Sequence, residues 1–177
     1  MTRASTARRL SRWGLLLIFT YGALVHLLMA RWCRWWAFRP GSVPGPAVGW
    51  LTDLGFATLG GSIFARLMLF FPSRAGSPQA RQYGILSAAL KGLAATAAAL
   101  ECLYVLEAAA LGLWAYSGDP TEGPLHVMIL LAFLDVQTYG LQPLVQGALL
   151  GSVFGGLAGF LTVKLESNYP GLVREPL

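Results

Sequence analysis

Residues 143–165 read PLVQGALLGSVFGGLAGFLTVKL, and this stretch decides the fold class. It is apolar over the length of about 20 residues that a helix needs to cross the hydrocarbon core of a bilayer. Its glycines recur at every fourth position, at Gly147, Gly151, Gly155 and Gly159. Helices in lipid associate through close packing, because lipid removes the hydrophobic drive between them. We therefore interpret the row as a glycine zipper for helix packing, whose partner helix lies either in the same chain or in another copy.

The composition of the whole chain agrees with a membrane protein. The 177 residues are 55% hydrophobic and only 12% charged, and the mean hydropathy is +0.58. A soluble domain carries about 25% charged residues, so an ordinary soluble fold, a disordered chain and a coiled coil are excluded. The remaining class is an all-α, polytopic transmembrane helical bundle, and the length allows one such domain.

Five spans are expected within a single transmembrane domain, residues 13–166. A basic N-terminal tail (1–12) precedes the domain and a C-terminal tail (167–177) follows it. The predicted spans are 13–31, 47–71, 85–116, 122–139 and 143–165.

The split between the last two predicted spans rests on length. One helix over residues 125–165 would measure about 60 Å, twice the hydrocarbon thickness of a bilayer. The intervening QTYGLQP is polar, Gly140 suits the position after a helix, and Pro143 suits the first turn of the next one. Four spans with a kinked last helix are the alternative.

The arginines predict the orientation in the membrane. Four arginines lie in the first 12 residues, before the first apolar run. Arginines flanking apolar runs indicate the positive-inside rule and anionic head groups, and they argue against nucleic-acid binding. We expect an uncleaved first span, with the N-terminus on the cytoplasmic side, or on the matrix or stromal side in an organelle.

Several polar side chains fall inside the predicted spans. A charged group in lipid is costly and normally faces the interior of a bundle, so these residues form a candidate intramembrane polar network: His26, Asp53, Glu101, Glu107 and Asp135. We expect Asp53 and Glu107 to share His26 as a partner. Three interpretations stay open: structural hydrogen bonds and charge pairs, a path for ions or protons, and a divalent metal site whose ligands are unknown.

Catalytic patterns are missing from the sequence. It contains no H-E-x-x-H, no G-x-S-x-G and no Walker A motif, and neither Cys33 nor Cys102 lies in a C-x-x-C pair. Gln137, Gln142 and Gln146 surround the predicted break, where they either satisfy freed backbone groups or line a polar pocket. The sequence thus favours a protein that is not an enzyme, and it indicates no particular cofactor.

Two function classes follow. The first is a small packing or assembly subunit of a larger membrane complex, joined through the glycine-zipper helix. Its partners are the lipid bilayer and either further copies of the chain or other membrane subunits. The alternative is a transporter or channel for a small solute, an ion or protons, which uses the buried carboxylates.

Overall fold

The chain forms a bundle of four helices. The computed structural model describes residues 8–37, 45–69, 78–118, 123–169 and 174–176. In chain order, the elements are β1 (Arg8–Leu10), α1 (Arg12–Ala37), α2 (Gly45–Leu69), α3 (Pro78–Gly118), α4 (Leu125–Asn168) and β2 (Arg174–Pro176). The all-helical bundle predicted from the composition is confirmed.

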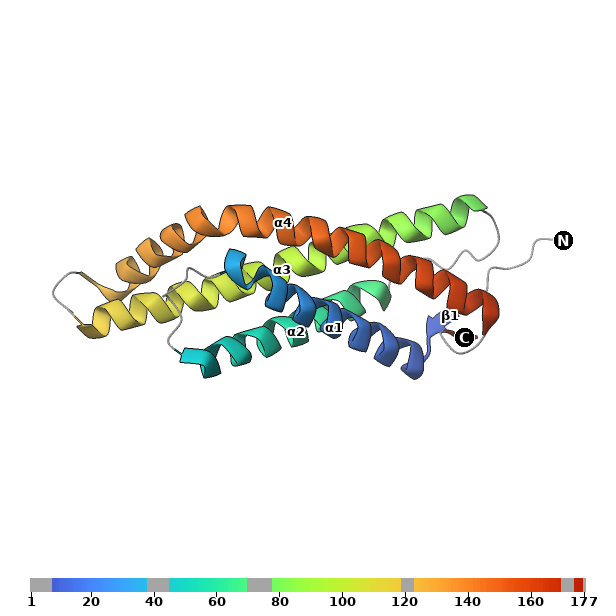
Figure 1. Ribbon diagram of the computed structural model, residues 1–177, viewed down its shortest axis with the longest axis horizontal. Helices are drawn as coiled ribbons and strands as arrows, with labels where there is room; N and C mark the ends of the chain where they lie inside the picture. The colour runs from blue at the N-terminus through green and yellow to red at the C-terminus, as the bar shows by residue number, and fades with distance from the viewer. Residues whose placement is uncertain (1–7, 38–44, 70–77, 119–122, 170–173, 177) are drawn as a thin grey trace.

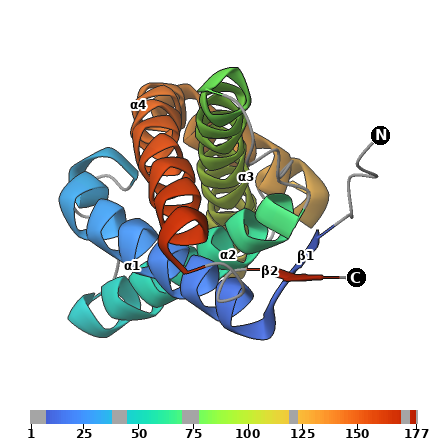
Figure 2. The same cartoon turned by 90° about the vertical axis from the view of Figure 1, so that its right-hand side faces the viewer.

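The helices run alternately up and down and form two hairpins (Figures 1 and 2). The long hairpin of α3 and α4 has the most extensive packing, and the shorter hairpin of α1 and α2 lies across it, with α2 against α3 and α1 against α4. The α1 helix begins with a cap, because the Gly14 amide donates a 2.9 Å hydrogen bond to Ser11 Oγ.

The two chain ends lie together at one end of the bundle. Strand β1 pairs with β2 in antiparallel fashion, with Arg9 opposite Glu175. The start of α1, which follows β1, and the end of α4, which precedes β2, must therefore lie on one side of the bundle, and an even number of helices connects them. The expectation of five spans is wrong, since the part of the chain that the structure describes forms four helices.

The predicted break in the last apolar region is also absent. Helix α4 runs without interruption from Leu125 to Asn168, with Pro143 inside it and buried. Gly140 does not end a helix. Its carbonyl accepts a 3.2 Å hydrogen bond from the Tyr104 hydroxyl of α3. Packing against α3 supports both halves of α4, and the proline bends the helix instead of ending it (Figure 1).

Among the described residues, three helices are long and apolar enough to cross a membrane. They comprise residues Arg12–Arg31 of α1, Gln82–Gly118 of α3 and Leu125–Asn168 of α4. Many large apolar side chains point outward, such as Leu24 and Leu149, which are 55% and 59% exposed. An outer surface of this kind suits contact with lipid chains and indicates a membrane protein.

Glycines bring the backbones of α3 and α4 into direct contact. A Cβ atom on Gly155 would overlap the Ala88 carbonyl and lie 2.9 Å from Gly92 Cα. A Cβ atom on Gly92 would in turn overlap the Gly151 carbonyl. The glycine hydrogens therefore point at carbonyl oxygens of the facing helix, an arrangement typical of weak Cα–H···O contacts.

All four glycines of the row are buried, and each faces α3 of the same chain. A Cβ atom on Gly159 would lie 2.7 Å from Ala88 Cβ, and one on Gly147 would lie 2.7 Å from Leu100 Cδ1. The row thus packs within the chain, and its surface is occupied by α3.

Adjacent glycines in α4 provide a test of this contact. We expect Gly155→Ala to destabilise the bundle by about 1–3 kcal/mol, because the methyl group would collide with backbone that cannot move aside. The matched control is Gly156→Ala, whose Cβ would meet Ala89 Cβ at an ordinary 3.6 Å. The measurement is the thermal unfolding midpoint of both variants in lipid nanodiscs. Equal midpoints would contradict the packing described here.

Candidate functional site

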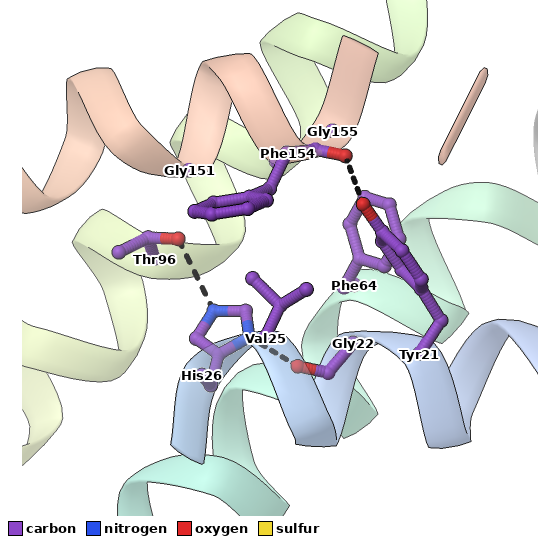
Figure 3. A pocket seen from close by; sticks show the side chains of 10 residues that line it. Tyr21, Gly22, Val25, His26, Phe64, Thr96, Gly151, Phe154 and Gly155 are labelled. Carbon is purple, nitrogen blue, oxygen red and sulfur yellow. Dashed lines mark hydrogen bonds between the residues drawn. The ribbon is translucent and has the colours of Figure 1, made fainter. Parts of the chain in front are cut away.

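The imidazole of His26 connects two helices inside the bundle. His26 lies on α1 and is 3% exposed. Its Nδ1 lies 2.7 Å from the Gly22 carbonyl, and its Nε2 lies 3.1 Å from Thr96 Oγ1 of α3 (Figure 3). Because a carbonyl oxygen only accepts, Nδ1 donates to Gly22; a neutral ring then accepts at Nε2 from the Thr96 hydroxyl. Both ring nitrogens are satisfied, and the ring links α1 to α3.

Residues of α2 pack around the imidazole of His26. The Phe56 ring meets the His26 ring edge to face, with the two centroids 5.2 Å apart. Gly60 leaves the space that the imidazole fills, since a Cβ there would lie 2.5 Å from His26 Cγ. Any larger residue at position 60 would displace the ring from its place beside Thr96.

Helix α4 completes the arrangement from the opposite side. Thr96 is fully buried, and a Cβ on Gly151 would overlap its hydroxyl oxygen. All four helices therefore meet at one point, which we call the four-helix junction and define by His26, Gly60, Thr96 and Gly151.

A small cavity adjoins the four-helix junction and is lined by residues of all four helices, with Phe64 contributed by α2 (Figure 3). It has room for about one water molecule. Along its wall, the Tyr21 hydroxyl donates a 2.9 Å hydrogen bond to the Phe154 carbonyl of α4. The groups that face this space can hold or exchange hydrogen bonds, and the imidazole is the one basic group in the lining.

The buried carboxylate of Asp53 has its own partner. Asp53 is 4% exposed, and its Oδ2 lies 3.7 Å from Arg31 Nε at the far end of α1. The Arg31 guanidinium also stacks on Trp50, 3.7 Å above the ring centroid. The expectation that Asp53 shares His26 with Glu107 is therefore incorrect: Arg31 stands beside Asp53, and His26 is bonded to Gly22 and Thr96.

The remaining predicted polar residues occupy other places along α3 and α4. Glu101 accepts a 2.7 Å hydrogen bond from the Gln137 side chain, which joins the two helices near the bend. Glu107 is partly buried, whereas Asp135 is exposed. His26, Asp53 and Glu101 thus each have different partners, and no three His, Cys, Asp or Glu side chains lie close enough to hold a metal ion within the described ranges.

Sequence reasoning missed Thr96 and Tyr104, both of which are fully buried. Thr96 follows Gly92 by four residues on the small-residue face of α3, so its position on this face could have predicted that it is buried between helices. Tyr104 gave no such signal, because its partner is a backbone carbonyl 36 residues away.

Comparison with known proteins adds no relative: no protein-family model, curated sequence or solved structure matches the chain. The assignment of function accordingly depends on the geometry alone.

The hydrogen bond between His26 and Thr96 can be tested by removing its hydroxyl. We expect Thr96→Val to lower stability by about 1 kcal/mol, because Nε2 of a buried ring loses its partner, while Thr96→Ser retains most of the stability. Thr58→Val serves as a control, since the exposed Thr58 hydroxyl bonds only to the Leu54 carbonyl of its own helix. The free energy of unfolding of all three variants is measured by chemical denaturation in mixed micelles. A loss for Thr58→Val as large as that for Thr96→Val would argue against a specific role of the junction.

Proposed function

We propose that this chain is a four-span membrane protein whose termini both face the cytoplasm or its organellar equivalent. Three helices have the length and apolar character of spans, and α2 lies against α1 and α3 at the same depth. The pairing of β1 with β2 supports termini on one side. The two charged residues of α2 are compatible with a span. Asp53 lies beside Arg31, and Arg66 is in the last turn, where a long side chain can extend its charge to the membrane surface.

The distribution of basic residues supports this orientation. Eight of the ten lysines and arginines that the structure describes belong to the end that carries both termini, counting the adjoining half of each helix. They are Arg8, Arg9, Arg12, Arg66, Arg81, Lys91, Lys164 and Arg174. An excess of this size follows the positive-inside rule with the termini inside.

The α3–α4 hairpin is too long for the bilayer and extends beyond α1 on the opposite side (Figure 1). His26 and Thr96 are hydrogen-bonded, so they mark the point at which α1 and α3 reach the same depth. From this point α1 continues for 11 residues to its end at Ala37, whereas the same number of residues along α3 reaches only Glu107. Helix α3 then continues to Gly118, about 11 residues or ~16 Å farther.

This extension, which we call the projecting hairpin, comprises residues 107–118 and 125–137. Its two helices remain packed, since a Cβ on Gly112 would lie 2.6 Å from Ile129 Cα. Its large apolar side chains are nevertheless exposed: Leu113 52%, Trp114 75%, Leu130 57%, Leu131 61% and Leu134 54%. An apolar surface of this kind outside the hydrocarbon core marks a site of protein contact.

The projecting hairpin carries the functional proposal. We infer that the protein is an assembly subunit that docks against another membrane protein through this hairpin. No Lys or Arg occurs between Lys91 and Lys164, whereas five of the eight acidic residues do. A partner surface with basic residues among apolar ones fits that charge. In this proposal the glycine row holds α4 against α3 so that the hairpin can project, instead of contacting the partner itself.

Transport is the second candidate, and the cavity beside His26 is the observation that favours it. The buried carboxylates give weaker support for an ion or proton path than the cavity does, because Asp53 and Glu101 have separate partners on different helices. Solute or proton flux by the purified chain in proteoliposomes would favour transport over the assembly role.

The four-span topology predicts that both termini are labelled from the same side. Single cysteines are introduced by Ser5→Cys and Ser167→Cys in a background with Cys33→Ser and Cys102→Ser. We expect both to react with an impermeant maleimide only after the membrane has been permeabilised to expose its inner face. Labelling of the two positions from opposite faces of sealed vesicles would contradict four spans and restore an odd number.

The assembly role predicts a discrete neighbour at the projecting hairpin. We expect a photo-crosslinking amino acid at Leu131 to form a protein adduct of defined mass in native membranes. The same amino acid at Leu90, which is 58% exposed on the membrane-level part of α3, serves as the control and should give no such adduct. Leu113→Gln combined with Leu131→Gln should release the chain from its complex on a native gel without loss of helix content. Identical crosslinking at Leu90 and Leu131 would count against docking through the hairpin.

A further inference from the structure

The end of the bundle that carries the termini has an aromatic level. Trp13 on α1 and Tyr83 on α3 stand the same number of residues before the hydrogen-bonded His26 and Thr96, toward the end of the bundle that carries the termini. Both side chains point outward, with exposed fractions of 67% and 72%. Amphipathic rings of this kind prefer the head-group region of a bilayer. The level of Trp13 and Tyr83 therefore marks the inner membrane boundary.

Basic residues gather just outside this boundary. Arg12 is exposed directly before Trp13, and Lys164 is exposed near the end of α4. The β1–β2 ribbon lies next to the start of α1 and holds the backbones of Arg8, Arg9 and Arg174 together, as the end-on view illustrates (Figure 2). Because the two strands come from opposite ends of the chain, this concentration of charge exists only when the ribbon is paired.

The opposite boundary differs in its chemistry. There the guanidinium of Arg31 is stacked on Trp50 and lies beside the buried carboxylate of Asp53. Its charge is thus balanced within the protein. Within the described residues of the terminal end, two acidic residues, Glu166 and Glu175, are set against eight lysines and arginines.

We propose that the terminal end, built from the β1–β2 ribbon and the basic residues around Trp13 and Tyr83, is a binding site for anionic phospholipid of the inner leaflet. Arginine donates to phosphate oxygens with a fixed planar fork, and a basic residue near an anionic surface contributes about 1 kcal/mol of attraction. The occupant is a lipid instead of a soluble anion, because the charges stand immediately outside the aromatic level where lipid phosphates lie. The proposal does not depend on the assembly role of the projecting hairpin.

The experiment measures binding of short-chain phosphatidylglycerol to the full chain in a neutral detergent. Dioctanoyl phosphatidylcholine and glycerol 3-phosphate are the comparison ligands. We expect phosphatidylglycerol to bind at least ten times more tightly than either. Removal of two ribbon charges by Arg9→Gln with Arg174→Gln should weaken its binding about 30-fold, which corresponds to ~2 kcal/mol at 1.4 kcal/mol per tenfold.

Two further variants decide between binding and a general effect of charge or folding. Arg34→Gln with Arg39→Gln removes the same charge from the segment that follows Arg31 in the sequence and should leave the affinity within about twofold. Arg9→Lys with Arg174→Lys keeps the charge and should retain most of the binding. If the glutamine variant loses binding and the lysine variant does not, the loss is due to the missing charge and not to unfolding. Equal binding of glycerol 3-phosphate, or equal losses in the Arg34 and Arg9 pairs, would overturn the proposal.

Discussion

Direct contact between the backbones of α3 and α4 is the constraint on which the rest of the structure depends. Gly92, Gly151 and Gly155 let a carbonyl of each helix lie against the Cα atoms of the other. Since lipid gives helices no hydrophobic reason to associate, such contact must supply much of the attraction. It also fixes the register, because one step along either helix would bring side chains where only hydrogen atoms fit. That register sets Thr96 against Gly151 and thereby creates the place that His26 reaches.

The polar groups inside the bundle follow from this register and act mainly to specify it. The hydroxyl of Tyr21 reaches the Phe154 carbonyl, that of Tyr104 reaches the Gly140 carbonyl, and Gln137 donates to Glu101. Hydrogen bonds between membrane helices contribute only about 0.6 kcal/mol each on average. An unpaired polar group in the same surroundings costs several times more. The polar contacts therefore penalise other arrangements more than they stabilise this one.

The difference in helix length gives the two ends of the protein different roles. Helices α1 and α2, with 26 and 25 residues, match a bilayer, whereas α3 and α4, with 41 and 44, exceed it. The excess extends to the side away from the termini as a two-helix projection that is acidic and apolar. In the proposed arrangement, the terminal side ends close to the membrane boundary and carries most of the described basic residues. Docking of a protein partner and binding of anionic lipid are thus proposed for opposite ends of the bundle.

The sequence alone determined the helical membrane class, the apolar regions and the small-residue face of α4, because these depend on composition and on a period that any helix imposes. It misjudged residues 125–165, where bilayer thickness seemed to require a break at Gly140 and Pro143. Only the tertiary structure decided that α3 supports α4 through this bend, and that the paired termini require an even number of helices. The partners of His26 and Asp53 were likewise beyond the sequence. Thr96 is 70 residues from His26, and such a pairing depends on how four helices pack and not on any local pattern.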